Sequence, residues 1–524
     1  MCYFTKNDPR LKTERRLTQS RVAHFHSMKN VADILSHQAK LQPSKVCLIH
    51  SESGRSLSYL QLNGMADRVA RLLQRCGVGS GDRVILLLPN TLEYFYLFFG
   101  IAKIGAIVVP LDIGLKDLEL TNLISHCEPK VLVMTSAVRG NYKFLKNTCL
   151  RIVVGDPTEA GDLSLERGLE EVGDGPVFHV QDPHMPLMLF YTSGTTGNPK
   201  GVVHAHSTIL TKTEAWQKRL HLDSSHRVLC VLPLSFIATW VVDAFPSLYC
   251  GGTLVLCSPF DSMMLSELGT LIQKYQITSF SVVPAILRIL LHIEVPEVSQ
   301  CRFVICSGAP LSVDAIQHFE KKYDVPIFHL YGMTEATLVA IESIDNPERG
   351  KGSVGKPLAC EVQISDSGEI WLRGCLMLGY FRRPDLTREA TQGGWFRTGD
   401  LGHLDAHGNL YLDGRSKEII IRAGRNIYPN EVDEVIGKHD AVAECVTFGI
   451  PDPVQGEKVV SVIVLKRSAK VTAPDVIAHC RRYLVDYKCP SSVRFVDSIA
   501  KNNRGKINRN SIAVWAQENF PDLI

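Results

Sequence analysis

The hydrophobic and polar positions of this chain alternate between the period of a helix and that of a buried strand. Leu62, Ala66 and Val69 recur at the spacing of one helix face. A turn at 81–82 then leads into an unbroken apolar run, which predicts a buried strand over 83–89. The same alternation continues and predicts helices near 91–104 and 116–126 and strands at 107–110 and 130–134.

The middle third repeats the pattern, with short apolar runs separated by helix-length segments. Alternation of this kind predicts an α/β fold, in which helices cover both faces of parallel sheets. Ligands of such sheets bind beyond the carboxyl ends of the strands. The apolar runs lie at 228–234, 253–257, 278–283 and 302–306.

After about residue 358 the character of the chain changes. Two short strands around turns, at 361–364 and 368–374, predict a small antiparallel, barrel-like part. Beyond Arg415 a smaller α+β unit is expected, and we place the domain boundary at Lys417. The chain then consists of a large N-terminal domain, 1–416, and a small C-terminal domain, 417–524. Within the latter we expect strands at 418–422, 442–449, 458–465 and 492–497 and helices at 431–437 and 475–485.

Composition narrows the possible functions. The chain has 524 residues and a net charge of +3, so charge gives no reason to expect nucleic acid binding. Its 15 cysteines form no C-x-x-C pair, which indicates reduced thiols in a cytoplasmic protein. The segment 1–21 lacks the apolar core of a secretory signal. The most apolar segment, 94–113, contains Lys103 and predicts a core helix and a strand instead of a membrane span.

The stretch 191–201, Tyr-Thr-Ser-Gly-Thr-Thr-Gly-Asn-Pro-Lys-Gly, carries the strongest chemical signal. Glycines let the backbone approach a ligand, and N–H groups, hydroxyls and a lysine together suit phosphate oxygens. The P-loop spacing is not met, so a phosphate cradle of another kind is expected, with a flexible Ser/Thr/Gly loop as the alternative. The cradle residues are Thr192, Ser193, Gly194, Thr195, Thr196, Gly197 and Lys200.

Five further motifs follow the cradle in a fixed order. Together the six motifs resemble those of the adenylate-forming superfamily, which includes acyl-CoA synthetases, adenylation domains of nonribosomal peptide synthetases and firefly luciferase. The resemblance spans roughly residues 30 to 515. The five segments are Ser307-Gly-Ala-Pro-Leu311, Tyr331-Gly-Met-Thr-Glu335, Gly394-Trp-Phe-Arg-Thr-Gly-Asp400, Asp413-Gly-Arg415-Ser-Lys417-Glu418 and Asn503-Arg-Gly-Lys506-Ile-Asn-Arg509.

This resemblance implies an acid–thiol ligase that uses ATP, Mg²⁺ and coenzyme A. Glu335 would bind magnesium and Thr334 the α-phosphate, although a Thr-Glu pair also suits a helix N-terminus. Tyr331 would stack on adenine. The base and its surroundings would further involve Gly332, Ser307, Gly308, Ala309 and Pro310.

The resemblance also implies roles for residues of the later motifs. Asp400 and Arg415 would bind the ribose, with a turn aspartate and a surface ion pair as alternatives. Lys506 would be the catalytic lysine of the small domain, although Ala500 and Asn502 depart from the usual pattern. The small domain would rotate about a hinge at Lys417 and bring Gly424 to the pantetheine arm. The nearby cations Arg422, Arg425 and Lys438 would meet coenzyme A phosphates or be plain surface charges.

The resemblance also implies that four residues line the acyl pocket: Phe236, Trp240, Val283 and His329. No aspartate lies between Pro233 and Trp240, so an α-amino acid, whose ammonium would be buried unpaired, is disfavoured. We therefore expect a fatty or aromatic monocarboxylic acid, which suggests a role in fatty acid metabolism. The acceptor would be coenzyme A or the phosphopantetheine of an acyl carrier protein acting in trans, and the enzyme a monomer or homodimer. Oxidation of the adenylate and nucleotide binding without catalysis remain alternatives.

Overall fold

The computed structural model describes residues 28–521 apart from gaps at 142–148, 158, 178, 193–199, 259–261, 309–310, 347–348, 350, 423–424, 454 and 502–506. Two compact units make up the chain. The first contains the residues up to Ser281 together with Thr334–Thr337 and Cys375–Pro384. The second contains Val282–Met333, Leu338–Gly374 and the residues from Asp385 onward.

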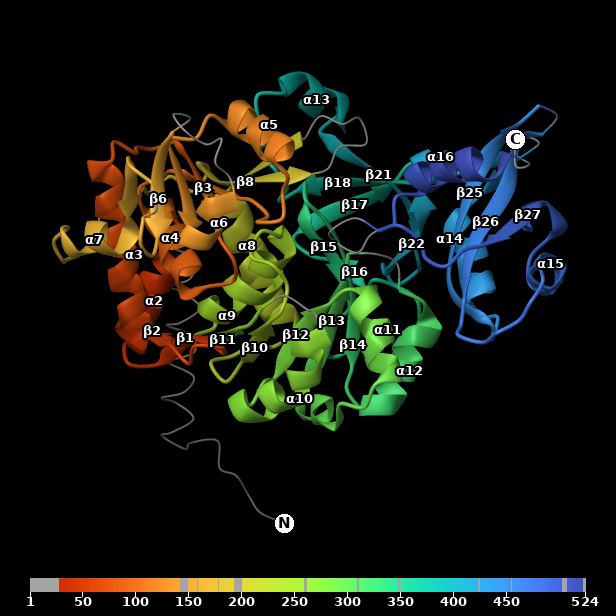
Figure 1. Cartoon of the computed structure of the whole chain (residues 1–524), viewed down its shortest axis with the longest axis horizontal. Coiled ribbons are helices and arrows are strands. Elements are labelled where there is room, and N and C mark those ends of the chain that lie inside the picture. Colours follow the sequence, from red (N-terminus) through yellow and green to blue (C-terminus); the bar gives the residue numbers. More distant parts are fainter. Residues whose placement is uncertain are drawn as a thin grey trace, which may run out of the picture. The chain divides into compact units, whose positions relative to one another are not determined.

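The first unit contains an eight-stranded sheet, of which β3, β6 and β8 are labelled in Figure 1. Its central strands are parallel, whereas β9 pairs antiparallel with both β8 and β19. The predicted strands at 83–89, 107–110 and 130–134 are thereby confirmed. The order is β19 (Gly379–Tyr380), β9 (Lys200–Ala205), β8 (Pro186–Thr192), β4 (Ile107–Pro110), β3 (Arg83–Leu87), β5 (Val131–Thr135), β6 (Leu150–Val154) and β7 (Asp162–Ser164).

A second sheet of the first unit is built from the apolar runs of the middle third. β10 pairs in parallel with β11 and β12, and β11 in parallel with β1. The strands run in the order β12 (Ser279–Val282), β10 (Arg227–Cys230), β11 (Thr253–Leu256), β1 (Val46–His50) and β2 (Ser56–Ser58). The accompanying helices are α2 (Asp33–Leu41), α3 (Tyr59–Arg75), α4 (Leu92–Lys103), α5 (Asp117–Cys127), α6 (Ser136–Asn141), α7 (Leu165–Glu170), α8 (His206–Arg219), the π-helix η1 (Thr239–Ala244), α9 (Phe245–Tyr249) and α10 (Ser262–Tyr275).

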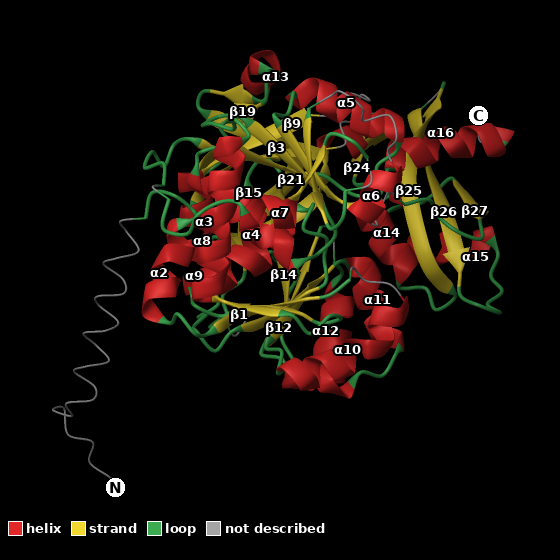
Figure 2. Ribbon diagram, turned by 60° about the vertical axis from the view of Figure 1, so that its left-hand side comes forward, coloured by secondary structure: helices red, strands yellow, loops and turns green. Residues whose placement is uncertain are grey.

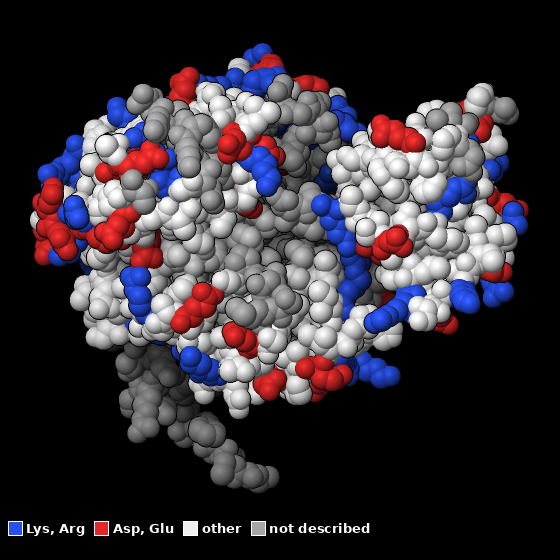
Figure 3. All heavy atoms as spheres, viewed as in Figure 1, with Lys and Arg blue, Asp and Glu red and all other residues white. Residues whose placement is uncertain are grey.

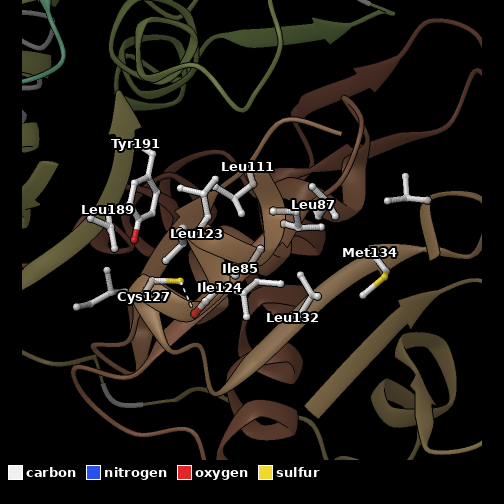
Figure 4. Close-up of a cluster of buried hydrophobic side chains, with 14 of the residues drawn as sticks. Ile85, Leu87, Leu111, Leu123, Ile124, Cys127, Leu132, Met134, Leu189 and Tyr191 are labelled. Atoms are coloured by element: carbon white, nitrogen blue, oxygen red, sulfur yellow. Dashed lines mark hydrogen bonds between the residues drawn. The ribbon is translucent and has the colours of Figure 1, made fainter. Parts of the chain in front are cut away.

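The core of the first sheet reaches the start of the phosphate cradle. Figure 4 shows Ile85, Leu132 and Met134 of the parallel strands in one cluster with Leu123 of α5 and Tyr191 of β8. Burial of such side chains stabilises the fold by roughly 1.5–3 kcal/mol each. Tyr191 is therefore held by the core directly before the cradle begins.

Helix α4 is buried along its whole length, including its one charged residue of the last turn, Lys103. The Lys103 Nζ lies 2.8 Å from Asp67 Oδ1 of α3 and donates a hydrogen bond to Asn63 Oδ1 at 2.9 Å. The ammonium inside this apolar segment is therefore paired within the protein core. In the part of the chain that the structure describes, no helix is both long and apolar enough to cross a membrane.

The second unit begins with parallel strands and continues into antiparallel sheet. β13 (Phe303–Ser307) pairs in parallel with β14 (Ile327–Met333), and β15 (Thr337–Ile341) pairs antiparallel with β16 (Lys356–Pro357). The predicted antiparallel part is confirmed as β17 (Cys360–Ile364), β18 (Glu369–Gly374), β21 (Trp395–Leu404), β20 (Thr391–Gln392) and β22 (Leu410–Arg415). Its helices are α11 (Pro284–His292), η2 (Pro296–Gln300), α12 (Val313–Tyr323) and α13 (Pro384–Glu389).

The last hundred residues form the predicted small α+β part, in which β25, β26 and β27 lie side by side (Figure 2). Helix α14 (Pro429–Gly437) packs on the long strand β25 (Val442–Asp452), and two apolar clusters form its core. The boundary at Lys417 stays a prediction. The other elements are η3 (Ser416–Glu418), β23 (Ile420–Arg422), β24 (Arg425–Ile427), β26 (Gly456–Leu465), α15 (Ala473–Arg481), η4 (Asp486–Lys488), β27 (Ser492–Phe495) and α16 (Arg509–Asn519).

The charges on the face shown in Figure 3 are of both signs and interspersed, in line with a net charge of +3. The described cysteines are free thiols. Burial raises the pKa of several of them, for example that of Cys306 to about 12, so these thiols stay protonated at neutral pH.

Candidate active site

The predicted phosphate cradle lies between two antiparallel strands, β8 and β9. β8 ends at Thr192 and β9 begins at Lys200, and these two residues are paired across the hairpin. The Thr192 hydroxyl donates to the carbonyl oxygen of Lys200 at 3.4 Å. The strand before the cradle was predicted, whereas its antiparallel return strand was not. The remaining cradle residues, Ser193, Gly194, Thr195, Thr196 and Gly197, lie outside the described residues.

Thr334 and Glu335 lie in a turn between β14 and β15. The alternative that this pair begins a helix is therefore wrong. Two hydrogen bonds hold this turn in place. His204 Nε2 of β9 lies 2.7 Å from the carbonyl oxygen of Thr334. The Met377 N–H donates to the carbonyl oxygen of Glu335 at 2.8 Å. Burial lowers the pKa of His204 to about 4, so its ring is neutral at pH 7 and donates this bond from Nε2–H.

The residues around Glu335 fit a magnesium ion. Tyr380 donates a hydrogen bond from its hydroxyl to Glu335 Oε1 at 2.8 Å, which leaves Oε2 of the half-buried carboxylate for a cation. Mg²⁺ in nucleotide sites binds through one or two carboxylates and completes its shell with phosphate oxygens and water. Within the described ranges there is no group of three or more His, Cys, Asp or Glu side chains that could hold a metal alone. The single carboxylate of Glu335 therefore fits a magnesium ion that shares its shell with phosphate oxygens, as the resemblance predicts.

Two of the predicted nucleotide residues of the second unit, Tyr331 and Arg415, contact a third, Asp400. The Tyr331 hydroxyl donates to Asp400 Oδ2 at 2.6 Å, and Arg415 Nε lies 2.9 Å from Asp400 Oδ1. Asp400 and Arg415 are register partners on β21 and β22, and Asp400 is only 7% exposed. Burial and the neighbouring Asp400 carboxylate raise the pKa of Tyr331 well above its usual range, so the phenol stays protonated. Each carboxylate oxygen keeps a second lone pair that could accept from a ribose hydroxyl.

The sequence predicted Tyr331, Asp400 and Arg415 as nucleotide contacts, but not that Tyr331 and Arg415 both contact Asp400. Ser307 ends β13, where Gly308 follows with a φ of +94°, a conformation that favours glycine. Gly332 is exposed directly after Tyr331. Ala309 and Pro310 lie outside the described residues.

The two predicted pocket residues of the first unit differ in their surroundings. Phe236 is half-buried at the end of a turn in which its N–H donates to the carbonyl oxygen of Pro233 at 3.0 Å. Trp240 is fully buried, and its indole stacks on Phe98 with 4.0 Å between ring centroids. Its Nε1–H donates to the carbonyl oxygen of Leu234 at 2.8 Å. Trp240 therefore fills the core behind the 233–238 segment, and its place in the pocket stays a prediction.

The other two lie in the second unit. Val283 is half-buried and directly precedes α11, and His329 is a buried residue of β14 paired with Cys306. For both, a part in the acyl pocket stays a prediction.

One turn after Trp240, the π-helix η1 carries a buried carboxyl group that the sequence did not single out. Ser281 donates to Asp243 Oδ1 at 2.6 Å, and among the described residues no hydrogen-bond partner reaches Asp243 Oδ2. Burial raises the pKa of Asp243 to about 7. The folded protein then keeps a proton that the unfolded chain releases at about pH 4.

We therefore expect the free energy of unfolding to fall through this group as pH rises from about 4 to 7, by an amount on the order of 3 kcal/mol between pH 5 and pH 8. Asp243→Asn should abolish that fall. Urea unfolding of both proteins at several pH values measures it. The buried neutral His204 and His206 act in the opposite direction, but equally in both proteins, so the difference between the two isolates Asp243. A constant difference across this range would contradict the assignment.

The remaining predicted residues belong to the small domain, and the structure describes only some of them. Lys417 is exposed in the 3₁₀ turn η3, where a hinge is predicted. Arg422 was considered as a coenzyme A contact, but its guanidinium donates to the side chain of Gln455 and to the carbonyl oxygens of Tyr487 and Cys489. The Arg422 guanidinium therefore forms its hydrogen bonds within the domain. Gly424 and Lys506 lie outside the described residues.

Arg425 and Lys438 are placed differently from Arg422. The Arg425 guanidinium lies 4.8 Å from the centroid of the Tyr487 ring, and Lys438 forms an exposed ion pair with Glu434. Both keep charge at the surface. Their suggested contact with coenzyme A phosphates stays a prediction.

The chain is similar to known proteins in both sequence and fold. A family model described as AMP-binding enzyme matches residues 35–381, and one described as AMP-binding enzyme C-terminal domain matches residues 431–506. A sulfoacetate–CoA ligase of Cupriavidus necator is 32% identical over 91% of this chain and 96% of its own. A long-chain-fatty-acid–CoA ligase of Mycobacterium tuberculosis is 30% identical over 92% of this chain and 97% of its own. The crystal structure of ATP-bound MatB from Rhodopseudomonas palustris, 24% identical, superposes with a TM-score of 0.86 over 94% of this chain and 100% of that one, and so has the same fold.

Proposed function

The chain belongs to the AMP-binding enzymes of the adenylate-forming superfamily, as an acid–thiol ligase of the acyl-CoA synthetase type, and on that premise we propose that its substrate is an apolar fatty or aromatic monocarboxylic acid. The reaction has two steps. A carboxylate oxygen of the acid attacks the α-phosphorus of ATP, and pyrophosphate leaves. The coenzyme A thiol then attacks the acyl carbon, and AMP leaves.

The first step joins two anions, so positive charge and alignment are what the protein must supply. We assign the cradle and Lys200 to the β- and γ-phosphates, Thr334 to the α-phosphate, and Glu335 to a magnesium ion that would neutralise phosphate charge. The hairpin position of Lys200 and the hydrogen bonds that hold the 334–335 turn support this assignment.

In the second unit we assign Asp400 and Arg415 to the ribose hydroxyls and Tyr331 to the adenine. The Tyr331 and Arg415 contacts hold the Asp400 carboxylate in one orientation, which supports a role as a fixed acceptor. Lys506 is proposed to bridge carboxylate and phosphate oxygens during adenylation. Rotation of the domain from Lys417 onward would then exchange Lys506 for the loop that carries Gly424.

The single observation that carries the substrate proposal is the apolar character of residues 233–240, the segment that leads into η1. The residues 233–240 contain no charged side chain, and the segment is backed by the aromatic cluster around Trp240. A second anionic group or an ammonium on the acid would need a buried partner of opposite charge. The two relatives act on acids of different polarity by name, so the substrate class rests on these residues and not on the similarity.

An ATP–pyrophosphate exchange assay over fatty, aromatic, dicarboxylic, sulfonated and amino acids tests the proposal. We expect exchange with fatty or aromatic acids and at least about tenfold less with acids that carry a second charge, the loss expected for about 1.4 kcal/mol of unpaired charge. Preferential exchange with a sulfonated or dicarboxylic acid would refute the substrate class. Adding coenzyme A, or a carrier protein bearing phosphopantetheine, to the reaction then identifies the thiol acceptor.

A further inference from the structure

One tyrosine outside the predicted motifs, Tyr380, contacts both Glu335 and Lys200 of the first unit. We propose that Tyr380 is a positioning residue that orients the Glu335 carboxylate for Mg²⁺ and at the same time holds the Lys200 ammonium of the cradle. The inference rests on the proposed function, because the metal-binding role of Glu335 is part of it. No step of the chemistry is assigned to Tyr380 itself.

The backbone around Tyr380 is fixed to the cradle. β19 pairs antiparallel with β9, and the register sets Tyr380 opposite Val202, two residues after Lys200. The Phe381 N–H donates to the carbonyl oxygen of Gly201, and the Leu378 N–H to that of Val203, both at 2.7 Å. Tyr380 is thus placed by the strand that leaves the cradle.

The same short segment also holds Glu335 at two points. The Met377 N–H donates to the carbonyl oxygen of Glu335 at 2.8 Å, and the Tyr380 hydroxyl donates to Oε1 at 2.8 Å. Tyr380 is only 8% exposed, so water competes little for this bond. A donor fixed on one carboxylate oxygen restricts rotation of the group and directs the other oxygen to the cation, as partners of metal ligands commonly do.

The ring of Tyr380 faces the cradle lysine. Lys200 Nζ lies 5.3 Å from the ring centroid, within the range of a cation–π contact. A single side chain therefore contacts the cation expected at the β- and γ-phosphates and the carboxylate expected at the metal. The hydroxyl and the ring carry these two contacts separately, so they can be removed one at a time.

The test is Tyr380→Phe, which keeps the ring and removes the hydroxyl. Mn²⁺ binding to the complex of enzyme and non-hydrolysable ATP analogue, followed by electron paramagnetic resonance, should weaken about 10–100-fold. The Mg²⁺ concentration for half-maximal pyrophosphate exchange should rise in parallel, while affinity for the metal-free nucleotide stays within about twofold of that of the wild type, because the Lys200 contact remains. Tyr323→Phe is the matched control. It loses a buried hydroxyl that donates to the Leu290 carbonyl oxygen at 2.7 Å, and Mn²⁺ affinity should not change.

The combined variant Tyr380→Phe/Glu335→Gln separates positioning from a general structural effect. If Tyr380 acts through Glu335, the double variant should bind Mn²⁺ no more weakly than Glu335→Gln alone. Additive losses, or unchanged Mn²⁺ affinity in Tyr380→Phe, would overturn the inference. Either of these two outcomes bears on Tyr380 only if the wild-type enzyme exchanges pyrophosphate. Absence of exchange with every acid would instead refute the proposed function.

Discussion

The Lys506→Ala variant is expected to form acyl-AMP about 10²–10³ times more slowly than the wild type, while its affinity for ATP stays close to normal. Removal of one donor that acts on charge developing in the transition state has a cost of this size. The lysine is expected to bridge oxygens of both reactants only when the small domain presents it, so ground-state nucleotide binding depends mainly on the other motifs. Pyrophosphate exchange and calorimetric titration with ATP measure the two quantities separately.

Lys501→Ala is the matched control for this variant. Lys501 precedes the same motif, and its Nζ lies 2.7 Å from Glu444 Oε1 of β25. Its loss should leave exchange within a few-fold of the wild-type rate. Thioester formation from supplied acyl-AMP should survive in Lys506→Ala, because the lysine is assigned to the first step alone. A variant that forms acyl-AMP at the wild-type rate would show that the catalytic lysine is elsewhere in the small domain.

The Lys103→Met variant should lose about 3–5 kcal/mol of unfolding free energy, because it leaves a buried carboxylate without its partner. The Lys103 side chain is 1% exposed and that of Asp67 is 7% exposed, with 2.8 Å between Nζ and Oδ1. The Asp67 carboxylate would keep only the hydrogen bonds from neutral donors, such as the Val177 N–H at 3.0 Å. Chemical denaturation at pH 7 measures the change.

Two further variants test whether the pair, and not the lysine alone, sets this loss. Lys103→Met combined with Asp67→Leu should recover part of the stability, because no unpaired charge then remains. Lys218→Met removes an exposed lysine from an ion pair with Glu214 on α8 and should change stability by at most about 0.5 kcal/mol. A loss below about 1 kcal/mol in Lys103→Met would contradict the view that Asp67 depends on this lysine for charge compensation.

The elements that depend on local pattern could be predicted from the sequence. The apolar runs 83–89 and 107–110 became neighbouring parallel strands, and the lysine within 94–113 correctly argued for a core helix. The predicted helices and strands of the small domain occur in the expected order, because their apolar residues pack into one of two local cores.

The contacts that shape the candidate site could not be read in the same way. Tyr331 and Asp400 are 69 positions apart, and Tyr380 and Glu335 are 45 apart, so no local period reports either pair. In the sequence, His204 is one polar residue at the end of an apolar run. Its hydrogen bond to the Thr334 carbonyl oxygen spans 130 positions, so the local pattern does not indicate it. The turn at 334–336 differed from a helix start because β15 follows at once, which the residue types alone do not reveal.

The return of Cys375–Pro384 to the first unit has a consequence for synthesis of the protein. Until β19 has left the ribosome, β9 is the outer strand of its sheet, with the cradle at one end and open backbone N–H and carbonyl groups along its free side. Such edges pair readily with other chains. A nascent chain that ends between about residue 281 and residue 379 therefore carries an open sheet edge, and chaperone engagement should be greatest over this interval of translation.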